Sequence, residues 1–363
     1  MTKEEKKEEN PLALSARRRK RRIVRRAVLA LLLATVWVTQ SVPSLAEGYA
    51  RSVYPVISRL LSGFSRLFPF AVGDLFIGLS VVGLLLYPVL ARWRWRVPWK
   101  RVLLRQGEYL LWVYAWFYLA WGLNYSQPNF YQRTGIAYRP YSEEGFLRFA
   151  NGYVDALNAA YTPPTNLPGE EVCQEVTDVY ARLADSLAVH RPPRLSPRVK
   201  TMLFTPLASK VGVTGSMGPF FCEFTLNGDL LPTNYPATYA HELAHLLGIT
   251  SEAEANFYAY QVCVRSRVPA IRFSGYFSVL SHVLGNARRL LPQEEYARLL
   301  ESVRPEVIAL AKQTYTYWAG KYSPLVGNVQ NWLYDLYLKG NKIESGRKNY
   351  SEVVGLLIAY GEK

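Results

Sequence analysis

Three apolar runs near the N-terminus are the feature that most restricts how this chain of 363 residues can fold. Ala27–Ala46 carries no charge, and Phe68–Leu90 carries only one, at Asp74. Tyr109–Leu123 is also uncharged and rich in aromatic side chains, but it is shorter, and a position in the lipid interface is the alternative for it. Since a helix needs about 20 mostly apolar residues to cross a bilayer, we predict three N-terminal transmembrane helices, with the lipid bilayer as a partner.

The positions of the basic residues predict the orientation of these helices. Residues 1–26 carry a net charge of +7 and residues 91–105 a further +6, out of +15 for the whole chain. Each block adjoins an apolar run, which is typical of the cytoplasmic loops of membrane proteins. We therefore expect the N-terminus in the cytoplasm and the chain after about Asn124 outside the cell. No long basic face remains elsewhere, so we expect no nucleic-acid partner.

The first apolar run has a second interpretation. A basic leader, a short apolar core and the residues Ser44-Leu45-Ala46 resemble a signal peptide with its small-residue cleavage site. The long leader favours an uncleaved helix instead. Cleavage after Ala46 would leave the predicted orientation of the rest of the chain unchanged.

The chain thus divides into a basic cytoplasmic tail (1–26), a three-helix membrane anchor (27–123) and an outer domain (124–363). Helical periodicity dominates the outer domain, and only 200–204 and 220–226 have the character of strands. We predict a mostly α chain whose outer domain is α+β with a small sheet. Its cysteines, Cys173, Cys222 and Cys263, allow one disulfide at most, and buried free thiols are the simpler interpretation.

The stretch HELAHLLGITSEAEANF, residues 241–257, carries the strongest chemical signal. His241 and His245 are four residues apart, so on a helix their rings project from the same face and can bind one metal ion. Glu242 is placed to accept a proton from a water beside the metal without being a ligand itself. We predict Zn²⁺ as the cofactor, although two imidazoles and a carboxylate also suit other divalent metals.

A catalytic zinc site needs a third protein ligand and an open fourth position. After Gly248 we expect a second helix that begins near Ser251 and has Glu252 and Asn256 on one face. We predict Glu252 as the third ligand and Asn256 as the partner that orients a ligand. Glu254 is the rival ligand and is expected beside the site, but Ser251-x-x-Glu254 is a capping box, which favours Glu252.

Two resemblances follow from these residues. The HExxH motif followed by Glu-x-x-x-Asn resembles the gluzincin metallopeptidases, which implies a gluzincin-like outer domain and zinc-dependent hydrolysis of peptide bonds. The chain as a whole resembles an uncharacterised family of bacterial membrane proteins, catalogued as a domain of unknown function. That resemblance lies in WGLNYSQ (121–127), GVTGSMGPFFCEF (212–224), HELAHLLGITSEAEANFYAY (241–260), FSGYFSVL (273–280) and LYDLYLKGN…YSEVVGLL.

The gluzincin resemblance also implies how a substrate would bind. In such folds an edge strand before the zinc helix binds the substrate backbone by strand addition. We therefore predict a substrate strand at 220–226 that includes Phe220, Cys222, Glu223 and Phe224. Tyr276 and His282 are candidate donors to the oxyanion of the transition state, with ordinary packing as the competing interpretation of both.

The expected function is that of a membrane-anchored zinc metallopeptidase that faces outward and acts on a peptide or protein, with Glu242 as the general base. The alternative is a non-catalytic cell-envelope protein with a structural zinc site, which four protein ligands would close. In that case Cys263 or His282 would complete the site. A hydrolase of cell-wall peptide cross-links would share the chemistry and differ in its substrate.

Overall fold

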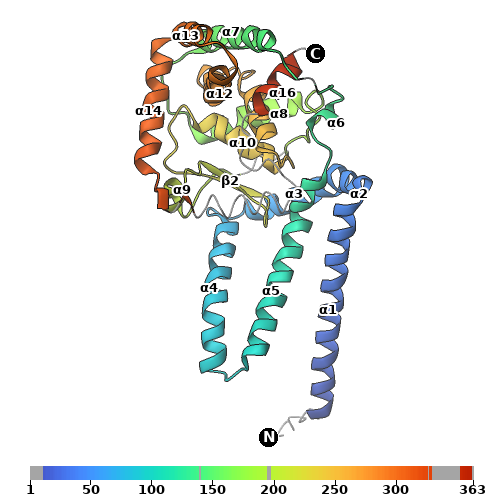
Figure 1. Ribbon diagram of the computed structural model, residues 1–363. Helices are drawn as coiled ribbons and strands as arrows, with labels where there is room; N and C mark the ends of the chain where they lie inside the picture. The colour runs from blue at the N-terminus through green and yellow to red at the C-terminus, as the bar shows by residue number, and fades with distance from the viewer. Residues whose placement is uncertain (1–10, 139, 194–197, 326, 329–351, 362–363) are drawn as a thin grey trace.

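The computed structural model describes residues 11–361, apart from 139, 194–197, 326 and 329–351. Three long helices, α1 (Pro11–Ser41), α4 (Val72–Trp93) and α5 (Trp99–Ala120), extend from one side of a mostly helical domain (Figure 1). They pack together through polar contacts as well as apolar ones. The Arg25 guanidinium lies 2.7 Å from the carboxylate of Glu108, and the Gln106 side chain donates to the carbonyl of Leu84 at 2.7 Å.

Two of these helices are long and apolar enough to cross a membrane, over Ala16–Ser41 and Val72–Trp93. A signal sequence near an N-terminus has the same properties, so α1 retains both interpretations. The prediction of three transmembrane helices is wrong for the third one, Tyr109–Leu123, which lies mostly in α5. The apolar part of α5 ends when the helix ends at Ala120, and its first half carries four charged side chains: Lys100, Arg101, Arg105 and Glu108.

Three short elements connect α1 to α4 and join these helices to the domain. They are α2 (Pro43–Gly48), a π-helical turn η1 (Tyr49–Val53) and α3 (Tyr54–Ser65). The buried side of α3 contains Tyr54, whose hydroxyl donates to the carbonyl of Leu246 at 2.7 Å. The opposite side exposes apolar side chains, including Leu60 and Phe64. α3 is therefore amphipathic, with its polar and aromatic anchors directed into the domain.

The helical domain is built around two helices, α10 (Tyr235–Leu246) and α11 (Glu252–Cys263), which are buried on nearly every side. α12 (Pro269–Leu290) packs against both of them. The surrounding elements are η2 (Gly122–Ser126), α6 (Phe130–Thr134), α7 (Glu143–Ala160), α8 (Gly169–Leu183), α9 (Thr205–Lys210), α13 (Gln293–Ser302), α14 (Pro305–Lys321) and α16 (Glu352–Gly361). The mostly α prediction with a small sheet is confirmed.

The sheet has three short strands in the order β1-β3-β2: β1 (Lys200–Thr201), β2 (Gly215–Gly218) and β3 (Glu223–Leu226). β3 runs parallel to β1 and antiparallel to β2. The prediction of an edge strand at 220–226 is wrong, since β3 is the central strand and all four of its residues are buried. The edge nearest α10 is β2, whose glycines gave little sign of a strand in the sequence.

The three cysteines are free and buried, which confirms the interpretation without a disulfide. Cys173, Cys222 and Cys263 lie in the interior of the domain, where each behaves as a small apolar side chain.

Candidate metal-binding site

Local sequence signals explain how α10 and α11 meet. Pro236 occupies the first turn of α10, where its missing N–H costs nothing. The chain leaves α10 through Gly248, which has φ of 96°, and a Cβ there would lie 3.1 Å from the Tyr54 ring. Ser251 then caps α11, its hydroxyl accepting from the N–H of Glu254 at 3.3 Å. The tight turn folds the second helix back onto the first.

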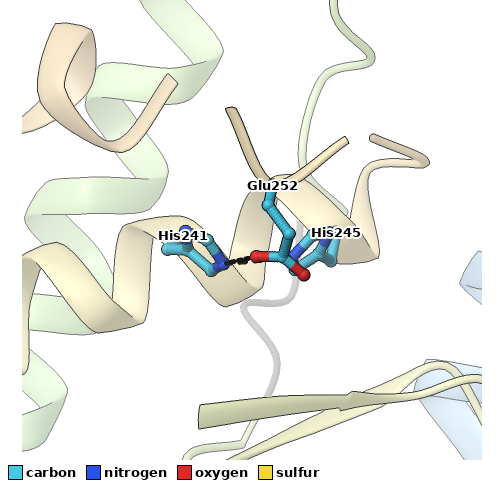
Figure 2. Close-up of side chains that lie close together, drawn as sticks. All are labelled: His241, His245 and Glu252. Carbon is cyan, nitrogen blue, oxygen red and sulfur yellow. Dashed lines mark hydrogen bonds and ion pairs between the residues drawn. The ribbon is translucent and has the colours of Figure 1, made fainter. Parts of the chain in front are cut away.

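This turn brings His241, His245 and Glu252 together, as Figure 2 shows. The Nε2 atoms of the two rings are 3.1 Å apart. Oε2 of Glu252 lies 3.1 Å from Nε2 of His241 and 3.7 Å from Nε2 of His245. One donor atom from each side chain lies within 4.8 Å of the other two. Spacing along two consecutive helices is therefore enough to assemble a three-donor cluster.

The other nitrogen of each ring fixes which atom can bind a metal. Nδ1 of His241 lies 2.9 Å from Oδ1 of Asn256, and Nδ1 of His245 lies 2.7 Å from the carbonyl oxygen of Ile249. Because both partners are acceptors, each ring in its neutral form carries its proton on Nδ1 and presents the lone pair of Nε2. Two lone pairs and a carboxylate then face one point, where a metal ion or a proton is needed to offset their repulsion.

The electrostatics of the cluster agree with that geometry. Burial alone would lower the pKa of His245, but the carboxylate of Glu252 outweighs it and raises the pKa to about 9. Burial would raise the pKa of Glu252, yet His245 and His241 hold it well below its usual value. The carboxylate is thus ionised, and the site attracts positive charge.

Glu242 lies beside the cluster and is packed against β2. Its side chain is buried, the residue being 4% exposed, and Oε2 has no hydrogen-bond partner among the described residues. Burial raises its pKa, while the two histidines and a hydrogen bond from the N–H of Met217 act in the opposite direction. A Cβ on Gly215 would lie 2.4 Å from Oε1 of Glu242, so only glycine leaves room for this carboxylate.

The cluster and Glu242 line a cleft of about 930 Å³. Polar side chains on its walls include Tyr125, Thr238 and Thr250, and apolar ones include Ile77, Phe117 and Phe220. The cleft is large enough for several residues of an extended peptide.

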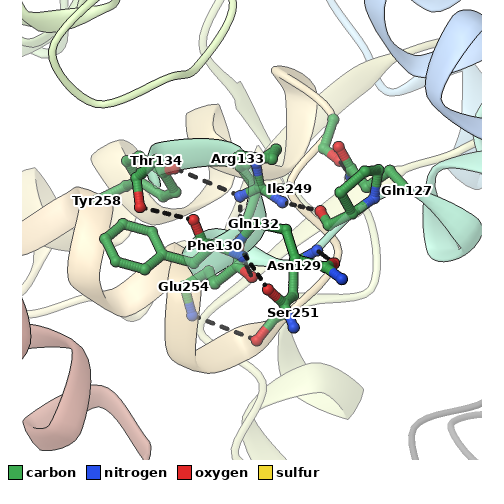
Figure 3. Close-up of polar contacts among 12 residues, drawn as sticks. Gln127, Asn129, Phe130, Gln132, Arg133, Thr134, Ile249, Ser251, Glu254 and Tyr258 are labelled. Carbon is green, nitrogen blue, oxygen red and sulfur yellow. Dashed lines mark hydrogen bonds and ion pairs between the residues drawn. The ribbon is translucent and has the colours of Figure 1, made fainter. Parts of the chain in front are cut away.

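Glu254 lies away from this cleft and has a structural role. Figure 3 shows its contacts. Its carboxylate accepts from the N–H of Phe130 at 2.9 Å and forms a buried ion pair with Arg133. The predicted capping box is half present, since Ser251 caps the helix but the Glu254 carboxylate serves α6 instead. Glu254 therefore joins α11 to α6 and does not contact the donors.

The structure does not bring Tyr276 or His282 to the cleft. The Tyr276 ring packs edge-on against Tyr260 at 5.5 Å, and its carbonyl accepts from the hydroxyl of Tyr153 at 2.6 Å. The carbonyl of His282 accepts from Asn286 one turn further along α12. Both follow the HELAH stretch (241–245) in the sequence, but among the residues of α12 it is Ser278 that lines the cleft.

Three of the four residues predicted for the substrate strand, Cys222, Glu223 and Phe224, do not line the cleft. Glu223 is buried in an ion pair with Lys200 and accepts from the N–H of Gly73, so it fixes β3 to the start of α4. Phe224 packs edge-on against Tyr239 at 5.1 Å, and Cys222 is fully buried. Phe220 alone among the four lines the cleft.

Comparison with known proteins adds one finding. The protein-family model described as "Protein of unknown function (DUF3810)" matches residues 49–358, from the π-helical turn to α16, and the matched range contains the whole cluster. Neither the curated proteins nor the solved structures gave a match. The expected resemblance to an uncharacterised family is confirmed.

Proposed function

We propose that this chain, which belongs to the DUF3810 family of unknown function, is a membrane-anchored zinc metallopeptidase that faces outward. The observation that carries the proposal is the convergence of His241, His245 and Glu252 with a buried, incompletely hydrogen-bonded Glu242 beside them. The gluzincin resemblance of the motif supports the same reaction.

The donors present fit a zinc ion. Two imidazoles and one carboxylate form one of the usual ligand sets of catalytic zinc, and three protein ligands leave a position for water or substrate. Both imidazoles have the oxygen partner on Nδ1 that metal-binding histidines generally have. A zinc ion bound there would lower the pKa of a water and polarise the carbonyl of the peptide to be cleaved.

Glu242 would serve as general base and then as general acid. Its carboxylate takes a proton from the attacking water, whose oxygen forms the new bond to the carbonyl carbon. The same proton passes to the amide nitrogen as the C–N bond breaks, so Glu242 ends in its starting form. Burial, which raises its pKa, suits it to both steps near neutral pH.

In this proposal β2 binds the backbone of the substrate. That role was predicted from the sequence for residues 220–226. The carbonyl of Thr214 accepts from the N–H of Asn227, so Thr214 is bonded across the sheet. Because these bonds alternate along an antiparallel pair, Gly215 and Met217 direct their polar groups away from β3. The N–H of Met217 already donates to Glu242. An extended peptide can add through the other outward-facing groups of this edge.

Two candidate spans and the basic blocks support the location. α4 and α1 are long and apolar enough to cross the membrane. The basic residues in the first half of α1 and around the end of α4 favour a cytoplasmic position for those ends. The domain with the cluster lies at the opposite ends of these helices (Figure 1). The peptidase would therefore act outside the cell.

The structural-zinc alternative requires a fourth protein ligand. Among the described residues only three donors converge. The Cys263 thiol lies 3.8 Å from the carbonyl of Pro236 and is not part of the group, nor is His282.

Metal analysis combined with a cleavage assay tests the proposal. Full-length protein reconstituted in lipid vesicles should contain one zinc ion per chain and should cleave members of a peptide library. Chelation should abolish cleavage, and added zinc should restore it. A protein that binds no divalent metal, or one whose cleavage is unaffected by removal of the metal, would exclude this function.

A further inference from the structure

We propose that the substrate of this site is a polypeptide anchored in the same membrane, and that its anchor-proximal part lies against α4 and α5. The proposal rests on the proposed peptidase function and adds the class of substrate. It follows from the walls of the cleft, the course of β2 and the apolar surface around the cleft.

The cleft that contains the metal donors is partly walled by a candidate membrane span. Ile77 of α4 lines it together with His241 and Glu252. Phe117 and Trp121 extend this wall at the end of α5, which packs against α4. A peptidase for soluble substrates needs no lining from a membrane helix, whereas a substrate that emerges from the bilayer would meet this wall first.

The edge strand β2 leads from the metal donors to the same helices. It begins at Gly215 beside Glu242 and continues into the turn that contains Phe220. The Phe220 ring lies 5.0 Å from that of Phe76 in α4 and 6.3 Å from that of Phe117 in α5. A peptide paired with β2 would therefore extend from the metal donors toward α4 and the end of α5.

The side of the domain that carries these helices also exposes apolar side chains. Leu67, after α3, is 75% exposed, and Leu207, in α9, is 55% exposed. The loop before α9 is fixed at the start of α4, where the N–H of Leu203 donates to the Asp74 carboxylate at 3.1 Å. Apolar surface beside membrane helices is typical of segments that lie in the lipid interface. The cleft therefore lies close to the membrane surface.

The charge of the side chains that line the cleft favours a polypeptide over a lipid headgroup as the ligand. None of the described residues that line it is Lys or Arg, and its acidic members are Glu242 and Glu252. Phosphate recognition generally uses cationic side chains, which this wall lacks. An uncharged peptide backbone that adds to β2 fits better than an anionic headgroup.

A matched pair of variants in α4 separates binding to the wall from simple concentration on the vesicle. The probes are a fluorogenic peptide with an N-terminal palmitoyl chain and the same peptide without it, added to vesicles of phosphatidylcholine and phosphatidylglycerol that contain the full chain. Ile77→Trp should narrow the wall and lower kcat/KM for the palmitoylated peptide about tenfold, with zinc content unchanged. Leu85 is exposed on the same helix and does not line the cleft, so Leu85→Trp should leave kcat/KM unchanged. Equal rates in the two variants would overturn the proposal.

A binding measurement decides the question independently of hydrolysis. The palmitoylated peptide, carrying a benzophenone on the residue next to the acyl chain, is irradiated with the Glu242→Gln protein in the same vesicles. Crosslinks to α4 or α5 are expected, and their absence would overturn the proposal. If these crosslinks form while the unmodified protein cleaves neither peptide, the proposed peptidase activity is refuted. The proposal that the cleft binds a membrane-anchored polypeptide is then still supported.

Discussion

At the scale of single residues, the site depends on which atom of each side chain is already occupied. Asn256 and the carbonyl of Ile249 bind Nδ1 of the two histidines, so both Nε2 atoms are directed at Glu252. Glu242 has one oxygen bonded to the edge of the sheet and one without a partner in the described part of the chain. In the proposed mechanism these four neighbouring groups have two different tasks: His241, His245 and Glu252 bind the metal, and Glu242 transfers the proton.

Glu242→Gln should separate these two tasks. The amide keeps the size of the side chain but cannot accept a proton, so cleavage should fall by about 10²–10⁴-fold. The metal donors are untouched, so zinc content should equal that of the unchanged protein. Metal analysis beside the peptide assay measures both, and an active variant would refute the assigned role.

Glu252→Ala and Glu254→Ala form a matched pair two residues apart. The first removes a metal donor and should lower zinc affinity by well over tenfold with little loss of stability. The second leaves Arg133 buried without its partner, which should cost about 3–5 kcal/mol of unfolding free energy while zinc still binds. Zinc titration and chemical denaturation measure the two effects. Equal zinc retention in both variants would remove Glu252 from the site.

The affinity for zinc should depend on pH. In the metal-free protein His245 is protonated below its raised pKa of about 9, and zinc must displace that proton. The affinity should therefore rise as pH rises, by about tenfold per unit below 9, and should level off above it. Glu252 adds little, because its lowered pKa keeps it ionised throughout this range. Competition with a chelator across pH 6–9 measures the slope, and a flat profile would contradict it.

The sequence predicted those residues whose positions depend on one helix or on one tight turn. His241, His245 and Glu252 meet because helical spacing and Gly248 place them, and both signals are local. Tyr276 and His282 were candidates because they follow the motif in the chain. Their positions depend instead on how α12 rotates against α7 and α11, which no local pattern records.

At the scale of elements, β2 and the turn after it connect Glu242 to α4 and α5. Its glycines allow close approach to Glu242, and its following turn packs Phe220 onto α4. The same glycines hid the strand in the sequence, because glycine has a low strand propensity and no side chain to show alternation. The strand is stable here through pairing with β3 and through contact with α10.

Gly215→Ala should test the contact between β2 and α10. The new methyl group would overlap the Glu242 carboxylate, so the strand or the side chain must move, at a cost of about 1–3 kcal/mol. Cleavage should fall strongly while zinc remains bound, because the displaced group is not a metal donor. Gly152→Ala in α7, where nothing lies within 4 Å, is the control and should leave activity unchanged. An active Gly215→Ala protein would show that Glu242 does not need its position against β2.

At the scale of the whole molecule, the N-terminal helices and the domain form one connected structure. Tyr54 and Ser58 of α3 bond to the end of α10, Glu223 of β3 bonds to the start of α4, and Trp121, after α5, donates to the carbonyl of His245 at 3.0 Å. The segments around the cluster are thus fixed to α3, α4 and the end of α5. A domain cut free of these helices would lose the wall of the cleft that Ile77, Phe117 and Trp121 form.

The predicted orientation can be measured by labelling single cysteines. The three native thiols are buried, so an introduced cysteine should dominate the reaction with a membrane-impermeant maleimide on intact cells. Glu294→Cys, on exposed α13, should react from outside. Arg19→Cys, in the basic part of α1, should react only after permeabilisation, because basic segments stay in the cytoplasm. Complete absence of the residue-19 segment from the mature protein would instead show that the first apolar run is a cleaved signal peptide, and labelling of residue 294 only after permeabilisation would place the cluster inside the cell.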